Sequence, residues 1–303
     1  MGSVSAPLAA GAPHAGACGG SATPAAVLDG RTINQAQPEH LAADLRRILA
    51  GPPCAAAATL RAAAEGGVVQ AQLVYGQWLL DGRGVTRDPA QAVQWFHHAA
   101  RRSEPMALNM LGQCHAQGWG VAVNFLMAAY WFRLAALGGL DWGMYNYATA
   151  LTMGQGVEMD RAAALDWFLQ AAALDHAKSM NMVGSFHEDG WVVDRDLAAA
   201  ARHYRRAAER GDFRGQFNTA RLLIGEGRID AALPWLTKVP TSATPAFLHK
   251  ATAWLQALPG MPARHPADRE RHAPLRAVYL SRVEELRLRH GAREPLFQCG
   301  EAA

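Results

Sequence analysis

The sequence has little charge, few cysteines and no long apolar run. Only 18% of its 303 residues are charged, and a net charge of +3 is too small to indicate nucleic acid as a partner. The four cysteines lie far apart and form no CxxC pair, which argues against a zinc site and against a disulfide framework. No segment approaches the ~20 consecutive apolar residues of a membrane helix, so we expect no membrane insertion.

The first part of the chain also lacks the signals of a leader peptide. Residues 1–37 are rich in alanine, glycine and proline, with neither a basic start nor an apolar core. Such a composition does not bury enough apolar surface to fold, so we predict a disordered tail. Together with the unpaired cysteines, this favours the cytoplasm, with the periplasm as the alternative location.

The chain does contain abundant alanine and an internal repeat. Alanine favours helix because its side chain loses no entropy there, and half of all residues are hydrophobic. Four similar segments begin at Ala71, Ala107, Gly143 and Ser179, and consecutive starts are 36 residues apart (107−71, 143−107, 179−143). A fixed period of this length is typical of solenoids and other repeat arrays.

Each copy of the repeat predicts a helical hairpin. A glycine motif such as Gly82-x-Gly84 separates two helices in the first three copies. The first glycine can end a helix in the left-handed conformation, and the second permits a tight turn. The second helix then begins at a residue type that is preferred at the N-cap. These cap residues are Asp88, Asn124, Asp160 and Asp196.

The side chains of the two helices in a hairpin are complementary in size, since the first helix carries small residues where the second carries aromatic ones. Small residues in the first helix allow its partner to approach closely; they are Gly76, Gly112, Ala148 and Gly184. The second helix carries aromatic and alanine residues at spacings of three, four and seven, which place them on one stripe. One hairpin cannot bury that stripe alone, whereas stacked hairpins can. We therefore predict an all-α solenoid of antiparallel helix hairpins.

The pattern becomes irregular on both sides of the regular repeats, which span 71–214. Upstream, 38–50 and 54–66 are predicted as the two helices of a degenerate hairpin. Downstream, a fifth copy begins, but Trp235 falls four positions earlier than the period predicts. Atypical terminal units are expected because they cap the stack. With a further helix over 244–258, the solenoid is predicted to span 38–258.

Three segments follow the predicted solenoid. Residues 259–274 contain four prolines and predict a linker. Residues 275–291 have the spacing of an amphipathic helix, which could dock another protein or a second copy of the chain. Residues 292–303 are predicted to be a tail.

The pattern small–x–x–x–Leu–Gly…Gly–x–Gly–Val–x–x–Asp…Ala–x–x–Trp–x–x–x–Ala–Ala resembles the Sel1-like repeat, a relative of the tetratricopeptide repeat. The resemblance covers roughly 54–237 when degenerate copies are included. It implies a right-handed superhelical solenoid that binds a peptide or protein segment in signalling, secretion or envelope processes. We therefore expect a non-enzymatic scaffold or adaptor with an unidentified protein partner, no metal and no small-molecule cofactor.

The resemblance also carries an alternative function. A cysteine-rich subgroup of the family is reported to act as secreted β-lactamase-like proteins, with two paired cysteines in each repeat. No repeat here holds two cysteines, and the sequence has no nucleophile elbow and no glycine-rich phosphate loop. A hydrolase of the cell-wall or β-lactam type is therefore the disfavoured alternative.

Histidines offer two candidate metal sites, and the helical geometry argues against both. His97 and His98 are adjacent, and adjacent residues on a helix point about 100° apart, so they cannot chelate one ion. We expect them to lie on a solvated face. His115 and His187 occupy equivalent positions two repeats apart, or roughly 20 Å for hairpin layers of about 10 Å, which is too far for one ion.

The resemblance places a binding groove on the first helices of the hairpins. In tetratricopeptide folds these helices line the concave side, and alignment of the copies selects the inward-facing positions. The predicted peptide-binding groove comprises Gln70, Leu73, Gln77, Met106, Asn109, Gln113, Trp142, Tyr145, Thr149, Lys178, Asn181, Ser185, Glu188, Arg214, Phe217 and Arg221.

Flat apolar side chains are the expected anchors of this groove. Trp142, Tyr145 and Phe217 are of the kind that dominates binding energy. Packing between hairpins is the alternative role for Tyr145 and Phe217. Asn109 and Asn181 could hydrogen-bond a peptide backbone, because an amide offers both donor and acceptor.

One end of the predicted groove is basic. Lys178, Arg214 and Arg221 cluster in the last repeats of the alignment. Their charge would suit an acidic side chain or a C-terminal carboxylate of the bound segment.

Overall fold

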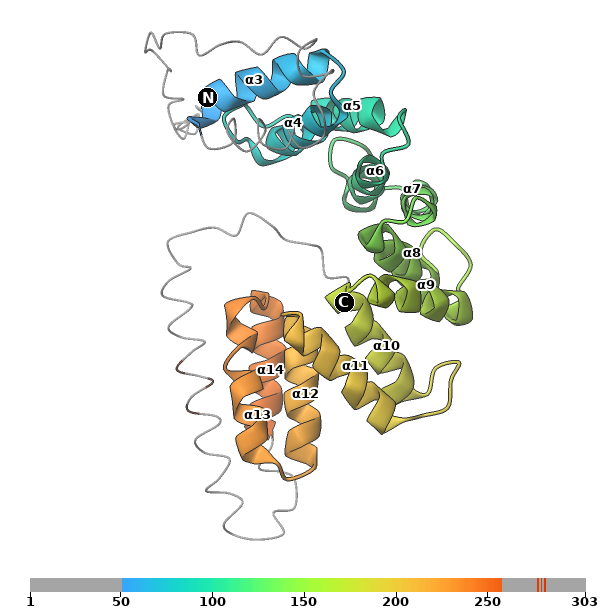
Figure 1. Cartoon of the computed structure of the whole chain (residues 1–303), viewed down its shortest axis with the longest axis vertical. Coiled ribbons are helices and arrows are strands. Elements are labelled where there is room, and N and C mark those ends of the chain that lie inside the picture. Colours follow the sequence, from blue (N-terminus) through green and yellow to red (C-terminus); the bar gives the residue numbers. More distant parts are fainter. Residues whose placement is uncertain (1–50, 258–276, 278, 280, 282–303) are drawn as a thin grey trace, which may run out of the picture.

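The computed structural model describes residues 51–257 together with 277, 279 and 281. Within this part of the chain there are α-helices, one short 3-10 helix and no strand. The helices follow one another in a curved row, with α3 near one end and α14 near the other (Figure 1). Several predicted segments lie outside the described residues: 1–37, 38–50, 259–274, 292–303 and most of 275–291.

Four regular hairpins form the middle of the row, and each helix packs against the next along the chain. The first helices are α4 (Val69–Asp81), α6 (Pro105–Gln117), α8 (Asp141–Met153) and α10 (Ala177–Asp189). The second helices are α5 (Pro89–Ala100), α7 (Phe125–Leu137), α9 (Arg161–Ala173) and α11 (Leu197–Glu209). The predicted all-α repeat solenoid is confirmed.

Shorter and irregular units flank the regular hairpins. Helix α3 (Pro53–Glu65) is the second helix that the sequence predicted over 54–66. At the other end come α12 (Phe213–Gly225), α13 (Ile229–Leu236), η1 (Val239–Thr241) and α14 (Pro245–Ala257). Helix α13 has 8 residues, whereas the regular second helices have 12 or 13.

Capping side chains start the second helices where the sequence predicted. The Asp88 carboxylate accepts the Gln91 N–H at 2.9 Å, and the Asn124 amide oxygen accepts the Met127 N–H at 3.0 Å. Asp160 and Asp196 make the same contact at 3.0 and 2.9 Å. These bonds satisfy donors that have no partner inside the helix, and they fix the register of each hairpin.

The second glycine of each turn is required by the stacking of the hairpins. Gly84, Gly120 and Gly156 have φ between 67° and 71°. A Cβ at any of them would lie 2.0–2.3 Å from a backbone oxygen at the start of the preceding second helix. In the fourth repeat Val192 takes this position with φ 54°, a conformation that a β-branched residue rarely adopts.

The core lies between the two helices of each hairpin and between neighbouring hairpins. A Cβ on Gly112 would lie 2.4 Å from the Phe132 ring, and one on Gly184 would lie 2.7 Å from the Tyr204 ring. The small residues of the first helices therefore accommodate aromatic rings from the second helices, as the sequence predicted.

A separate cluster forms the C-terminal core. It combines Phe217 from α12 with Leu236 from α13, Val239 from η1 and Leu255 from α14. Tyr279, which lies in the segment predicted as an amphipathic helix, is also buried in this cluster. Part of that segment thus closes the end of the solenoid.

Among the described helices, none combines the length and the apolar character that crossing a membrane requires.

Candidate binding groove

The first helices expose one face toward the inside of the curve. In Figure 1, α4, α6 and α8 lie on the inner side of the row, and α5, α7 and α9 lie outside them. Each first helix packs against the second helices before and after it, and α6–α8 and α10–α12 also touch directly. On α6 the face left open carries Met106, Met110, Gln113 and Gln117, at spacings of four and three residues.

Equivalent residues on the other first helices are also partly or fully exposed, and we call the complete set the groove stripe. It comprises, besides the four residues of α6, Gln70, Val74, Gln77, Asp81, Trp142, Asn146, Thr149, Met153, Lys178, Met182, Ser185, Asp189, Arg214, Asn218, Arg221 and Gly225.

Most of the predicted groove residues lie in the groove stripe. They are Gln70, Gln77, Met106, Gln113, Trp142, Thr149, Lys178, Ser185, Arg214 and Arg221. One aligned position was placed wrongly. Its residues are buried or pack against neighbouring parts of the solenoid instead of facing the groove, and they are Leu73, Asn109, Tyr145, Asn181 and Phe217.

The two asparagines at this position join adjacent first helices. Asn146 Nδ2 donates to Asn109 Oδ1 at 2.8 Å, and Asn218 Nδ2 donates to Asn181 Oδ1 at 2.9 Å. Asn109 and Asn181 are only 5% and 4% exposed. The expectation that they bind a peptide backbone is therefore wrong, because their amide groups lie in the contact between helices.

Phe217 is likewise part of the core and does not serve as an open anchor. Its ring lies 5.4 Å from that of Phe247 and 5.3 Å from that of Trp254, both on α14. The side chain is 9% exposed. The alternative role of packing between helical units is the one that the structure supports for this residue.

An aromatic cluster stands in the middle of the groove stripe. The Trp142 ring lies 6.1 Å from that of Tyr145 and 4.8 Å from that of His176, both edge-on or tilted. The Lys178 ammonium lies 4.8 Å from the centre of the Trp142 ring, within cation–π range. Tyr145 also contacts Phe168 in the core, so it anchors the cluster, while Trp142 is the ring that reaches the groove.

His176 is a buried member of this cluster, and its ring packs against those of Trp142 and Tyr145. The side chain is 6% exposed, and its Nδ1 accepts the Ser179 N–H at 3.3 Å, which caps α10. Burial lowers the pKa of His176 to about 4, against a smaller opposing effect of Asp141. The imidazole is therefore neutral at pH 7, and its acceptor nitrogen remains available for the cap.

The predicted basic end is partly neutralised inside the chain. Arg221 Nη2 bonds the Glu188 carboxylate, and the Tyr204 hydroxyl donates to the same oxygen at 2.8 Å. Burial would raise the pKa of Glu188, but the hydrogen bonds from Arg221 and Tyr204 outweigh it and lower the pKa. Arg221 therefore belongs to a polar contact between α10, α11 and α12 and is not a free cation of the groove.

Two sets of residues on the groove stripe are absent from the predicted groove. One set directly follows the misplaced positions and comprises Val74, Met110, Asn146, Met182 and Asn218. The other lies at the ends of the first helices and comprises Asp81, Gln117, Met153, Asp189 and Gly225. One signal was present in the sequence: the pairs Asn109/Asn146 and Asn181/Asn218 share a spacing of 37 residues, one more than the period. Such an offset is what a contact between successive first helices requires.

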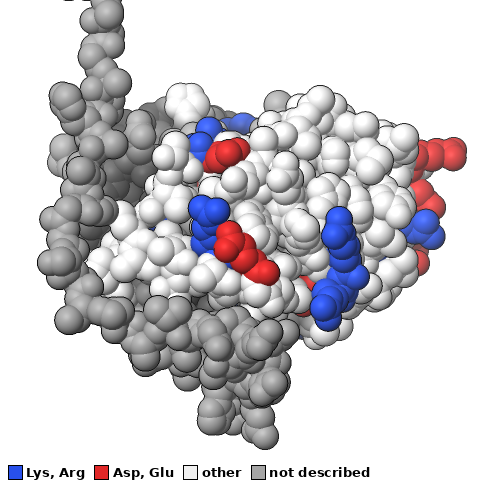
Figure 2. Space-filling view, turned by 90° about the horizontal axis from the view of Figure 1, so that it is seen from above, with Lys and Arg blue, Asp and Glu red and all other residues white. Residues whose placement is uncertain are grey.

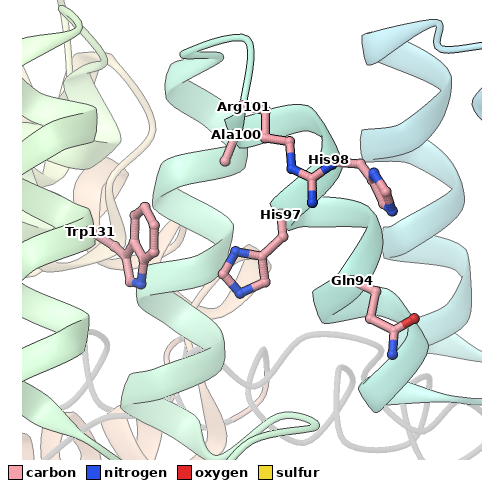
Figure 3. A pocket seen from close by; sticks show the side chains of 6 residues that line it. All are labelled: Gln94, His97, His98, Ala100, Arg101 and Trp131. Carbon is pink, nitrogen blue, oxygen red and sulfur yellow. The ribbon is translucent and has the colours of Figure 1, made fainter.

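The outer side of the solenoid carries a wide hollow between α5 and α7 (Figure 3). Its lining includes His97, His98, Arg101 and Trp131, and the His97 ring lies 5.7 Å from the Trp131 ring. Both histidines are exposed, as the sequence predicted. Burial and, to a smaller extent, the nearby His115 lower the pKa of His97, so the imidazole is neutral at pH 7.

The positions of the histidines, cysteines and acidic residues in the described part of the chain bear on metal binding. Within the described residues, no three His, Cys, Asp or Glu side chains gather closely enough to hold an ion. His187 stacks on His203, with ring centres 5.6 Å apart, rather than facing His115. Burial raises the pKa of the Cys114 thiol to about 12, so this thiol stays protonated.

Charge is sparse on the surface as well as in the composition. Figure 2 shows basic and acidic residues as separate small groups among uncharged residues on the face seen from above. On that face no broad basic surface of the kind that binds nucleic acid is present among the described residues.

The stacked hairpins and their inner stripe define a class of protein, the α-helical repeat solenoid. A family model for the Sel1 repeat matches residues 69–103, 105–140, 143–176 and 177–212. Residues 69–212 are thus four consecutive Sel1 repeats. Proteins with these repeats are generally scaffolds for protein–protein interaction.

Solved structures agree with this fold. A Sel1 repeat protein from Oxalobacter formigenes is 21% identical, with a TM-score of 0.64 over 78% of this chain and 98% of that one. A protective antigen with an SLR fold from uropathogenic Escherichia coli is 23% identical, with a TM-score of 0.61 over 84% of this chain. The match spans 56% of that antigen's length. No curated protein sequence matches the chain.

Proposed function

We propose that the protein is a non-enzymatic adaptor that binds a peptide or protein segment along the groove stripe. The proposal rests on the continuous inner face of the five first helices, which are α4, α6, α8, α10 and α12. The side chains on this face are polar or flexible, and packing between helices does not cover them completely. A curved solenoid presents such a face as an extended binding surface.

The composition of the groove stripe suits an extended segment. Met106, Met110, Met153 and Met182 provide apolar contacts that adapt to different shapes, since methionine is unbranched and polarizable. Glutamine, serine and threonine side chains lie on the same face of these helices. Together these side chains can bury apolar groups of a ligand and hydrogen-bond its backbone at several points.

Trp142 is the expected anchor, and Lys178 sets the charge beside it. The indole is half-buried and is held by His176 and Tyr145, so little side-chain entropy is lost when it binds. The Lys178 ammonium beside the ring favours a ligand with an acidic group next to an apolar one. A segment with this pairing is the partner chemistry that the groove favours.

A displayed library of random peptides tests the proposal. Peptides selected on the full-length protein should lose at least tenfold in affinity for Trp142→Ala, because a central aromatic anchor is worth about 2 kcal/mol or more. They should bind Tyr130→Ala, an exposed aromatic on the outer helix α7, as tightly as the unaltered chain. Isothermal titration calorimetry with the selected peptides provides both affinities.

Two results would overturn the groove model. One is equal affinity of the selected peptides for Trp142→Ala and for the unaltered protein, with circular dichroism showing that both are folded. The other is a loss of binding in Tyr130→Ala alone. Hydrolysis of nitrocefin by the purified protein above the buffer rate would contradict the non-enzymatic part of the proposal.

A further inference from the structure

A small pocket of about 160 Å³ lies between α11 and α12, outside the groove stripe. Three arginines line it: Arg202 and Arg205 from α11, and Arg228 from the turn before α13. The floor includes Thr219 of α12, and the one carboxylate in the lining belongs to Glu226. Three guanidinium groups against one carboxylate make the pocket positively charged.

Thr219 lines this pocket, but its hydroxyl oxygen is closed to solvent. The residue is 5% exposed, and among the described residues its Oγ1 has no hydrogen-bond partner. A buried hydroxyl without a partner costs free energy, and most such groups in proteins are satisfied. The arginines are therefore the groups that a ligand in the pocket can reach.

The arginines are only weakly engaged with carboxylates of the chain. Arg228 Nη1 lies 3.2 Å from Glu226 Oε2, while Arg202 Nη2 lies 4.0 Å from Asp196 Oδ2. No ion pair involves Arg205 within the part of the chain that the structure describes. Arg202 and Arg205 are three positions apart on α11, so their side chains leave the helix on the same face.

The place of this pocket in the repeat has a counterpart on the outer side of the solenoid. Gln94 and His97 stand three repeats (108 residues) before Arg202 and Arg205, and they line the hollow between α5 and α7 (Figure 3). The two places differ in charge, because glutamine and histidine in the earlier repeat are replaced by two arginines here.

We infer that this pocket binds a single phosphate group, as a phosphate monoester or as inorganic phosphate. Guanidinium groups match phosphate oxygens with paired hydrogen bonds, and three of them line this pocket. The small volume admits one such group and excludes a longer polyanion from its interior. The site is separate from the proposed groove, and its existence does not depend on the groove function.

Calorimetric titration of the full-length protein with inorganic phosphate and with O-phospho-L-serine tests the inference at low ionic strength. Binding of either probe at one site is expected. Arg205→Gln should weaken it at least tenfold, whereas Arg210→Gln should leave it unchanged. Arg210 lies on the same helix but pairs with Asp175 outside the pocket.

Thr219→Val is a second control, because it changes the lining without changing its charge. We expect this variant to bind the probes as tightly as the unaltered protein while its melting temperature is unchanged or higher, because a buried hydroxyl without a partner is removed. Binding of O-phospho-L-serine alone would indicate that the ligand is a phosphate ester carried by a partner. Binding of both probes would indicate that free phosphate is a ligand as well. No binding of either probe at millimolar concentration, or equal binding by Arg205→Gln and the unaltered protein, would overturn the site.

Discussion

At the scale of single residues, His176 links the groove to the stability of the fold. The neutral imidazole accepts the Ser179 N–H at the start of α10 and supports the Trp142 ring. Protonation would remove the acceptor and place a charge in a buried site, which is why burial holds the pKa at about 4. The cluster that forms the expected anchor therefore depends on one uncharged side chain.

This arrangement predicts a specific dependence of stability on pH. The pKa of His176 is lowered from 6.5 in the unfolded chain to about 4 in the folded one. The contribution of the neutral His176 to the free energy of unfolding is fully present above pH 6.5 and is lost progressively between pH 6.5 and 4. The total loss amounts to about 3 kcal/mol. Urea denaturation at pH 7 and pH 4 measures the loss.

The matched variant is His176→Asn, which can still cap α10 but does not titrate in this range. Between pH 7 and pH 4, the unfolding free energy of the unaltered protein should fall by about 3 kcal/mol more than that of the variant. The other histidines titrate in both proteins and cancel in the difference. Parallel pH profiles for the two proteins would show that His176 is not the group responsible.

At the scale of helices and turns, the regular repeats follow from local signals. The caps Asp88 and Asp160 act on backbone N–H groups three residues away, and the turn glycines act through their own φ angles. Interactions of such short range can be predicted from residues that are close together in the sequence. For this reason the start of each second helix and the place of each turn were predicted correctly.

Val192 is the exception at the second glycine position of the hairpin turns, and it yields a stability prediction. A β-branched residue at φ 54° costs about 1–2 kcal/mol, while glycine would cost about 0.5–1 kcal/mol in chain entropy. Val192→Gly should therefore raise the unfolding free energy by about 0.5–1 kcal/mol in urea denaturation. Val193→Gly, which removes a side chain packed on the core, should lower it. An unchanged or lower stability of Val192→Gly would contradict the assignment of strain to this residue.

At the scale of the whole molecule, the C-terminal unit closes the stack. Phe217 on α12 packs under α14, and Tyr279 joins the same cluster from a distant part of the sequence. In a solenoid each unit contacts only its neighbours, so stability is roughly a sum of local and nearest-neighbour contributions. Damage to this core should loosen the end of the solenoid first.

Phe217→Ala tests this picture. Removing a buried phenylalanine is expected to cost about 3–5 kcal/mol and to expose α12–α14 before the regular repeats. Hydrogen exchange followed by mass spectrometry should show lost protection in 213–257 and retained protection in α4–α9. Trp142→Ala, at a half-buried position, is the control and should change protection little outside its own neighbourhood. A uniform loss of protection along the whole chain in Phe217→Ala would contradict the local model.

The groove shows where reasoning from the sequence reached its limit. Adjacent residues on a helix point about 100° apart, so an error of one position moves a side chain to a different surface. The alignment selected Asn109 where Met110 faces the groove, because the rotation of each first helix is set by contacts with its neighbours. The composition and the repeat period do not specify how each first helix is rotated about its axis.

The sequence by itself determined the period, the helices, their caps and turns, and the family, because these depend on residues close together in the chain. The tertiary structure decided which face of each first helix is open, that Phe217 belongs to the core, and that Arg221 is paired with Glu188. It also decided that a pocket lies beside Arg205, between α11 and α12. These features depend on contacts between hairpins, whose geometry arises only when the repeats are stacked.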